Sequence, residues 1–303
     1  MSVQALPYIV VLGFLYGSTL VVSRFSVGQF EPSTYIGLRL MIAALAHTLI
    51  YAVSSKRHWS KDKRLWKHAI ILGILGTAVP MTSIVTGLQY ISSGLASILI
   101  TTNPALTVLM AHFLLSDERL SWRKTFGIGL ALSGAALLAL SGESGLIGEE
   151  NQAHIGYVLM AIAMVFGSAA SVYARKYMSD FDSFDVASVR MLSASLTVLP
   201  LSVLFVGFDL SAVTTVGYGG LAYAGLVGTF SGMLLAFYNI KHFGATAAAM
   251  TSYVIPIFAT LGGYLLLNEV ITTRMIIGMV IIVLGIAILN QRNPQRFKTT
   301  SPV

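Results

Sequence analysis

The chain has 303 residues, of which 55% are hydrophobic and 10% are charged, and its mean hydropathy is +0.79. This composition excludes an ordinary soluble domain, in which roughly a quarter of the residues are charged, and indicates an integral membrane protein. The chain has no cysteine, which excludes disulfides and thiolate metal sites, and its net charge of +7 is concentrated in loops. That distribution suits orientation in a membrane and gives no reason to expect a nucleic-acid partner.

Ten apolar stretches are each near the ~20 residues that a bilayer requires, and they are predicted to be transmembrane helices. They span residues 6–24, 34–53, 69–90, 94–115, 122–141, 155–175, 185–207, 217–238, 244–267 and 272–291. The first stretch has no basic segment before it and no clear cleavage site, so it is predicted to be a retained helix. Residues 91–94 alone separate the third and fourth stretches, which predicts a tight hairpin there.

The basic residues predict the orientation of these spans. With a cytoplasmic N-terminus, all but four of the 19 Lys and Arg residues fall on the cytoplasmic side. Of those four, Arg24 and Arg274 fall on the opposite side, and Arg39 and Arg190 lie inside spans. The positive-inside rule therefore predicts a multi-pass membrane protein with both termini in the cytoplasm.

The second half of the chain repeats the first at an offset of 150 to 151 residues. Matching positions include Arg24 and Arg175, Arg39 and Arg190, and Glu118 and Glu269, and they follow one another in the same order. Because each copy holds five spans, an odd number, the second copy enters the membrane from the opposite side. The predicted fold class is an all-α integral membrane protein of ten transmembrane helices, built as two inverted five-helix repeats. The predicted domains are residues 1–148 and 149–293, followed by a cytoplasmic tail at 294–303.

The fourth and ninth spans are interrupted at matching positions by Pro104 and Pro256. Interrupted helices in corresponding places of two repeats are the best pointer in a sequence to a transporter's binding site. A proline leaves a carbonyl one turn earlier without its amide donor, and nearby polar side chains can satisfy either that carbonyl or a solute. Packing around a kink is the alternative role. The polar candidates are Thr101, Thr102, Asn103, Thr251 and Tyr253, and the candidate hinges are Gly94 and Gly244.

The run GLASILITTNPALTVLMAHFLLSDERLSWRKTFGIGLALSGAALL and its second-half copy ending LNEVITTRMIIGMVIIVLGIAIL resemble the drug/metabolite transporter superfamily, EamA type. The arginines of GLRLMIAAL and SVRMLSASL match the same family. The resemblance covers essentially the whole chain. It implies a ten-helix transporter, usually a bacterial exporter of amino acids or small metabolites. It also implies that spans 1, 3, 4, 6, 8 and 9 surround a central cavity, with spans 5 and 10 as scaffold or dimer contacts. Further candidates in the cavity spans are Tyr16, Ser18, Phe166, Ser168 and Phe230.

The acidic residues all lie in loops or at span ends, which argues against a buried carboxylate as proton carrier. His47 lies deep in the second span as either a proton relay or a neutral donor of one interhelical hydrogen bond. Arg39 and Arg190 are candidates for binding a substrate carboxylate, but a structural role is favoured because they are repeat-related. One such role is a pair of ion pairs that joins the repeats, Arg39 with Glu269 and Arg190 with Glu118. A simpler role for the two glutamates is to complement the start of the next helix.

The sequence thus predicts a secondary transporter that exports amino acids or similar small neutral or zwitterionic metabolites by alternating access, with no cofactor, metal or nucleic-acid partner. An exporter of amphiphilic drugs is the main alternative. A sugar-phosphate carrier would need convergent cations in the cavity spans. His112 and Asp117 form the H-x4-D spacing of some membrane acyltransferases, but without a companion motif, so the chain is not expected to be an enzyme. A stripe of small residues at Gly127, Ala131 and Ala135 would fit either a homodimer contact or packing inside the bundle.

Overall fold

The computed structural model describes residues 3–116, 118–148 and 152–291, the side chains of 245–249 excepted. The predicted tail at 294–303 lies outside these residues, as do Asp117, Glu149 and Glu150. Within the described residues the chain is helical and has no strand. In this part of the chain nine helical stretches are long and apolar enough to cross a membrane, and a tenth, Thr251–Leu267, is shorter. The ten predicted spans are therefore confirmed as helices.

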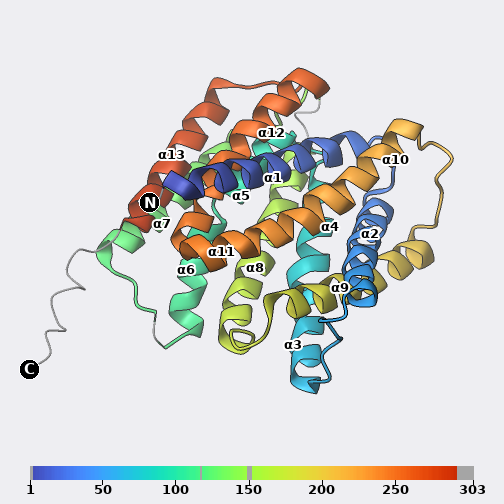
Figure 1. The fold of residues 1–303 in the computed structure, drawn as a ribbon. Coiled ribbons are helices and arrows are strands. Elements are labelled where there is room, and N and C mark those ends of the chain that lie inside the picture. Colours follow the sequence, from blue (N-terminus) through green and yellow to red (C-terminus); the bar gives the residue numbers. More distant parts are fainter. Residues whose placement is uncertain (1–2, 117, 149–151, 292–303) are drawn as a thin grey trace, which may run out of the picture.

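The helices follow one another as a bundle joined by short loops (Figure 1). In the first half they are η1 (Val3–Ala5), α1 (Leu6–Ser26), α2 (Pro32–Val53), α3 (Lys63–Gly73), η2 (Ile74–Ala78), α4 (Val79–Gly87), α5 (Ser93–Ile100), α6 (Asn103–Leu114) and α7 (Trp122–Leu140). In the second half they are α8 (Ala153–Tyr177), α9 (Ser183–Phe205), α10 (Thr215–Ala222), η4 (Tyr223–Ser231), α11 (Gly232–Ala249), α12 (Thr251–Leu267) and α13 (Thr273–Asn290).

The third and eighth spans are longer than the sequence predicts. The third begins at Lys63, where the side chain of Asp62 accepts a hydrogen bond from the Arg64 amide at 2.7 Å and caps the helix. Its first turns are polar, so the apolar window misses them. The eighth span runs on to Gly244, where φ of +82° and ψ of 164° break the helical geometry inside α11. That conformation is essentially restricted to glycine, and it sets the turn into the ninth span.

Both of these spans contain a π-helical segment in their middle, η2 in the third and η4 in the eighth. In each segment a threonine hydroxyl donates to the carbonyl five residues earlier. Thr77 bonds Leu72 O at 3.4 Å, and Thr229 bonds Ala224 O at 2.9 Å. Such wide turns are rare in helices and often lie at functional sites. The sequence analysis did not anticipate them.

The two halves pack against each other along three helix pairs (Figure 1). The repeat-related helices α2 and α9 pack together, as do α7 and α13, and α1 packs along α12 of the other half. Between α7 and α13 the backbones touch, because a Cβ built on Gly285 would lie 2.5 Å from the Ala131 amide nitrogen and 2.7 Å from Gly127 O. The small-residue stripe of the fifth span therefore packs inside the bundle, which is one of the two roles that the sequence allowed.

Candidate functional site

The interruptions in the fourth and ninth spans meet at the centre of the molecule. The fourth span breaks at Thr101 and Thr102, between α5 and α6, and the ninth at Met250, between α11 and α12. The Thr101 hydroxyl has contacts with Ser97 O at 3.0 Å and with Ser252 O, across the repeats, at 3.1 Å. Ser252 is the residue that corresponds to Thr101 in the second repeat. The two broken helices therefore cross where their backbone hydrogen bonding is incomplete.

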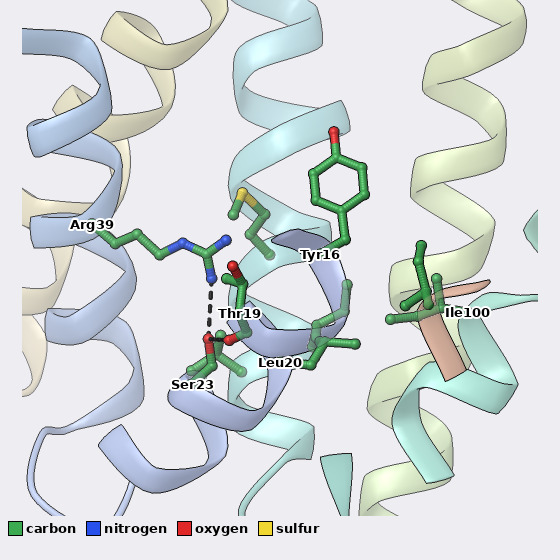
Figure 2. Close-up of a pocket in the computed structure, with 10 residues that line it drawn as sticks. Tyr16, Thr19, Leu20, Ser23, Arg39 and Ile100 are labelled. Carbon is green, nitrogen blue, oxygen red and sulfur yellow. Dashed lines mark hydrogen bonds between the residues drawn. The ribbon is translucent and has the colours of Figure 1, made fainter. Parts of the chain in front are cut away.

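A cavity of about 160 Å³ lies beside this crossing (Figure 2). Its polar lining consists of Tyr16, Thr19 and Ser23 from α1 and Arg39 from α2. Its apolar lining comes from α1, α4, α5 and α12. These residues are Leu20, Met81, Ile84, Val85, Ile100 and Ile255. Ile100 and Ile255 lie near the two breaks, so the cavity adjoins the two interrupted spans.

Arg39 is the charged group of this cavity, and its side chain is only 8% exposed. Its Nε donates to Thr229 Oγ1 at 2.7 Å, and its Nη1 donates to Ser23 Oγ at 3.1 Å. Figure 2 shows the side chain extending from α2 toward the α1 residues that line the same pocket. The family resemblance implies a cavity surrounded by other spans, with the second span outside it. That placement is wrong for Arg39, because the guanidinium is long enough to cross to α1.

Arg190 makes the repeat-related bond. Its Nη2 donates to Thr77 Oγ1 at 3.0 Å and to Gly76 O at 3.3 Å. Each arginine thus binds the threonine of the π-helical segment in the opposite half, Arg39 in η4 and Arg190 in η2. The sequence predicts that these arginines join the repeats, but the glutamate partners that it names are wrong. The bonds found across the repeats go from Arg39 to Thr229 and from Arg190 to Thr77 and Gly76 O.

Glu269 is buried, at 5% exposure, and binds the start of α5. Its Oε1 accepts from the Ser93 amide at 2.8 Å, and its Oε2 accepts from Ser93 Oγ at 2.8 Å and from the Gly94 amide at 3.3 Å. Burial raises the pKa of this carboxyl, against the bonds from Ser93 and Gly94, which lower it. The carboxylate therefore neutralises the positive end of a helix in the other repeat.

Glu118, the corresponding residue, has a different environment. Its side chain is 27% exposed and accepts from Arg175 Nη1 at 2.7 Å and from Lys124 Nζ at 3.3 Å. The hydrogen bond from Arg175, supported by that from Lys124, lowers the pKa of the Glu118 carboxyl. The simpler role predicted for the two glutamates, to complement the start of the next helix, is wrong for Glu269, whose bonds go to α5. Hydroxyls cap the next helices: Ser121 accepts from the Lys124 amide and Thr272 from the Met275 amide.

Three other predicted binding residues satisfy groups at or near the break in the fourth span. The Thr102 hydroxyl bonds Leu99 O at 2.7 Å, which is the role of a packed kink. Ser168 Oγ donates to Asn103 Oδ1 at 2.5 Å and so ties α8 to α6. Pro104 lies in the first turn of α6, next to the break in the fourth span. The interruption predicted at Pro256 is wrong, because Pro256 lies inside α12 and the ninth span breaks at Met250.

The remaining predicted residues are spread over several interfaces. Ser18 bonds the Tyr223 hydroxyl at 2.8 Å, and Tyr253 accepts from Asn290 Nδ2 at 3.1 Å. Thr251 is buried, and its hydroxyl has no partner among the described residues. Phe166 is half-buried in α8. Of the ten predicted binding residues, Tyr16 lines the cavity beside the crossing.

His47 is fully buried between α2, α9 and η4. Its Nδ1 lies 3.1 Å from Ser188 Oγ, and its ring packs between Phe184, at a centroid distance of 4.9 Å, and Phe230, at 5.0 Å. Its Nε2 has no hydrogen-bond partner among the described residues. One interhelical hydrogen bond between aromatic rings fits the structural role of His47 better than a role as proton relay.

The similarity to known proteins extends over most of the chain. The model of the EamA-like transporter family matches residues 4–140 and 154–291. The uncharacterized transporter YoaV of Bacillus subtilis is 26% identical over 94% of this chain and 96% of its own length. The probable terminal-alkyne amino-acid exporter of Streptantibioticus cattleyicolor is 25% identical over 76% of this chain and 75% of its own.

Two further matches extend these comparisons. The uncharacterized inner membrane transporter YedA of Escherichia coli K12 is 26% identical over 86% of this chain and 83% of its own length. One crystal structure, 20% identical, superposes with a TM-score of 0.62 over 92% of this chain and 94% of that chain, and supports the fold.

Proposed function

The chain belongs to the EamA-like transporter family, and on that premise we propose that it exports amino acids or similar small neutral or zwitterionic metabolites by alternating access. The protein is a multi-pass membrane transporter. The inner membrane is its proposed location, with both termini in the cytoplasm, because nearly all loop Lys and Arg residues then lie on the cytoplasmic side.

The observation that carries this proposal is the position of the cavity. It lies where two broken helices from opposite repeats cross, and it combines an apolar wall with a few convergent polar groups. Such a lining selects a small solute by shape and by a small number of hydrogen bonds. Repeats of opposite topology around a central site are the arrangement in which rocking of one half against the other opens each side in turn.

Coupling to protons finds little support in the chain. The acidic residues lie in loops or near the ends of spans, and Glu269 binds the start of α5. We therefore propose that the transporter exchanges its solute downhill, independently of a pH gradient. His47 is the one alternative proton carrier deep in a span.

Counterflow in proteoliposomes tests the proposed function. Purified protein is reconstituted with unlabelled amino acids inside, and labelled amino acids are added outside with and without an imposed pH gradient. We expect saturable exchange that the gradient does not change. Protein-free liposomes are the control for leakage. Absence of exchange for every amino acid in the mixture would refute the proposed substrate class.

An exporter of amphiphilic compounds is the second candidate, and a separate groove favours it. A groove of about 320 Å³ lies between α1, η4 and α12, and apolar side chains such as Phe14, Phe258 and Leu261 line it. A panel of toxic amphiphiles, tested on cells with and without the protein, distinguishes this candidate. Raised resistance without amino-acid exchange would favour it over the metabolite exporter.

A further inference from the structure

The cavity contains a buried positive charge without a carboxylate. Tyr16, Thr19 and Ser23 are the uncharged polar residues that line it, Arg39 is the cation, and no Asp or Glu is among its described lining residues. A guanidinium carries five N–H donors and stays charged in proteins. Two donors of Arg39 bond the hydroxyls of Thr229 and Ser23, and the Tyr35 hydroxyl lies beside the group. A cation buried at this depth is costly unless an anion compensates it.

A purely architectural role explains one bond of Arg39 and leaves the others unexplained. Arg190 makes the same cross-repeat bond to a threonine in a π-helical segment, so that bond belongs to the scaffold. The repeat-related positions of Ser23 and Tyr35 are Ala174 and Val186. The scaffold therefore does not require hydroxyls around this arginine.

The same asymmetry continues along α1. Tyr16 lines the cavity, whereas Phe166 is the corresponding residue of the second repeat. Thr19, also in the lining, corresponds to alanine whichever of the two offsets is used, at Ala169 or Ala170. Hydroxyl groups thus surround the arginine in the first repeat, next to a cavity.

We propose that Arg39 binds the carboxylate of the transported solute. The inference rests on the proposed function and names the part of the solute that is recognised. A guanidinium accommodates a carboxylate through two parallel N–H···O bonds. The hydroxyls of Thr19 and Ser23 already donate to Leu15 O at 2.6 Å and to Thr19 O at 2.7 Å, so the remaining N–H donors of Arg39 bind the carboxylate. The apolar residues Met81, Ile84 and Ile255 contact the aliphatic part.

The size of the cavity limits the solute. Its volume of about 160 Å³ is close to that of an engineered cavity of ~150 Å³ that holds a benzene molecule. The solute is therefore a short carboxylate, such as an amino acid with a small side chain. A phosphorylated sugar is too large for this space.

A competition series in proteoliposomes tests the proposal on the wild-type protein. Exchange of labelled alanine is measured with unlabelled alanine, lactate, which lacks the amine, or alaninamide, which lacks the carboxylate. We expect alanine and lactate to compete, and alaninamide to compete at least tenfold more weakly. Equal competition by alaninamide and alanine would overturn the proposal, whether or not any variant folds.

Two arginine variants locate the effect. Arg39→Gln is expected to raise the half-saturating alanine concentration at least tenfold and to remove the preference for carboxylates, whereas Arg39→Lys retains part of both. Arg190→Gln, the matched control, is expected to stay within twofold of the wild type. An unchanged half-saturating concentration in Arg39→Gln would overturn the proposal.

Thermal unfolding separates failure of the inference from failure of the proposed function. If the wild type transports no amino acid but lactate stabilises it and lactamide does not, and Arg39→Gln removes that stabilisation, then the carboxylate site is supported and the exported class is wrong. If lactate and alanine neither are transported nor stabilise the protein, the carboxylate site is refuted as well.

Discussion

The two ends of the bundle contain the same carboxylate in opposite settings. At one end Glu269 is buried and satisfied by the amides and hydroxyl at the start of α5. At the other end Glu118 is partly exposed and paired with Arg175 and Lys124. Arg24, which corresponds to Arg175, lies within electrostatic range of Glu269, but no ion pair joins them in the described residues. Positions that the repeat makes equivalent in sequence thus have different environments, as the proposed alternating access requires of any single conformation.

Removal of each carboxylate in turn is expected to give the largest difference in stability between the two ends. Glu269→Ala leaves the Ser93 and Gly94 amides buried without acceptors, each at roughly 1–3 kcal/mol. The Ser93 hydroxyl retains Ala259 O as an acceptor at 3.3 Å. After allowing for the desolvation of the lost charge, we expect a loss of about 2–4 kcal/mol in the free energy of unfolding. Glu118→Ala breaks partly exposed pairs worth about 0–1 kcal/mol each. Unfolding in detergent measures both, and equal losses would contradict the comparison.

The next largest difference in stability is expected between alanine variants of Gly244 and Gly94, the glycines near the starts of the two broken spans. Gly244→Ala forces a side chain into φ of +82° and ψ of 164°, at a cost of about 1–3 kcal/mol. Gly94 is helical, and a Cβ there would lie 3.0–3.3 Å from Thr260, an overpacking that costs about 1 kcal/mol. Unfolding measurements on the two alanine variants check the order.

The proposed hinge at Gly94 has its own test. Gly94→Leu is expected to slow exchange without changing the half-saturating solute concentration, because the larger side chain opposes sliding of α5 on α12. Unchanged turnover in a folded variant would argue that the glycine serves packing alone.

The pH dependence of stability should have opposite signs at the two ends. The pKa of Glu269 is raised in the folded protein, so its contribution to stability is complete below the ordinary value of about 4.3 and is lost as the pH rises through the folded pKa. The pKa of Glu118 is lowered, so its contribution is present above that ordinary value and is lost as the pH falls through the folded pKa.

Gln variants isolate these two contributions. Relative to Glu269→Gln, the wild type should become less stable as the pH rises above about 4.3. Relative to Glu118→Gln, it should become less stable as the pH falls below that value. Melting temperatures across an acid-to-neutral series give both differences, and slopes of equal sign would show that the ends do not differ in this way.

His47 is expected to give the smallest effect. His47→Gln keeps a side chain that can bond Ser188, so we expect exchange rates within about twofold of the wild type. The measurement is counterflow with and without a pH gradient. Accumulation that the gradient drives in the wild type, and that this variant loses, would make His47 a proton relay.

The helices and their interruptions are predictable from sequence because lipid imposes simple requirements on them. Each span needs about 20 apolar residues, and the breaks are signalled by proline next to polar side chains, as at Thr101 and Pro104. The inverted repeat follows from counting spans. Side-chain partners do not follow, because the partner of Glu269 depends on helix packing that no local pattern records.

The cavity was only partly predictable for a similar reason. Tyr16 was selected from its depth in the first span, but Thr19 and Ser23 were not. A signal for them was present in the repeat: Ser23 corresponds to Ala174 and Tyr35 to Val186, so the polar surroundings of Arg39 are readable from the aligned halves. The π-helical segments carry no such signal, because one additional residue in a turn leaves the composition unchanged.

The wide turn η2 has a consequence for the wall of the cavity. A π-turn holds one residue more than an α-turn, and in an α-helix one residue corresponds to a rotation of about 100° about the axis. If the wide turn migrates along the third span, only the residues that it passes rotate, while both ends of the helix stay in register. Met81, Ile84 and Val85 follow η2 directly. Displacement of the wide turn past them would turn their side chains away from the cavity without breaking the helix. The volume of the cavity would then change through a local rotation of these residues about the helix axis.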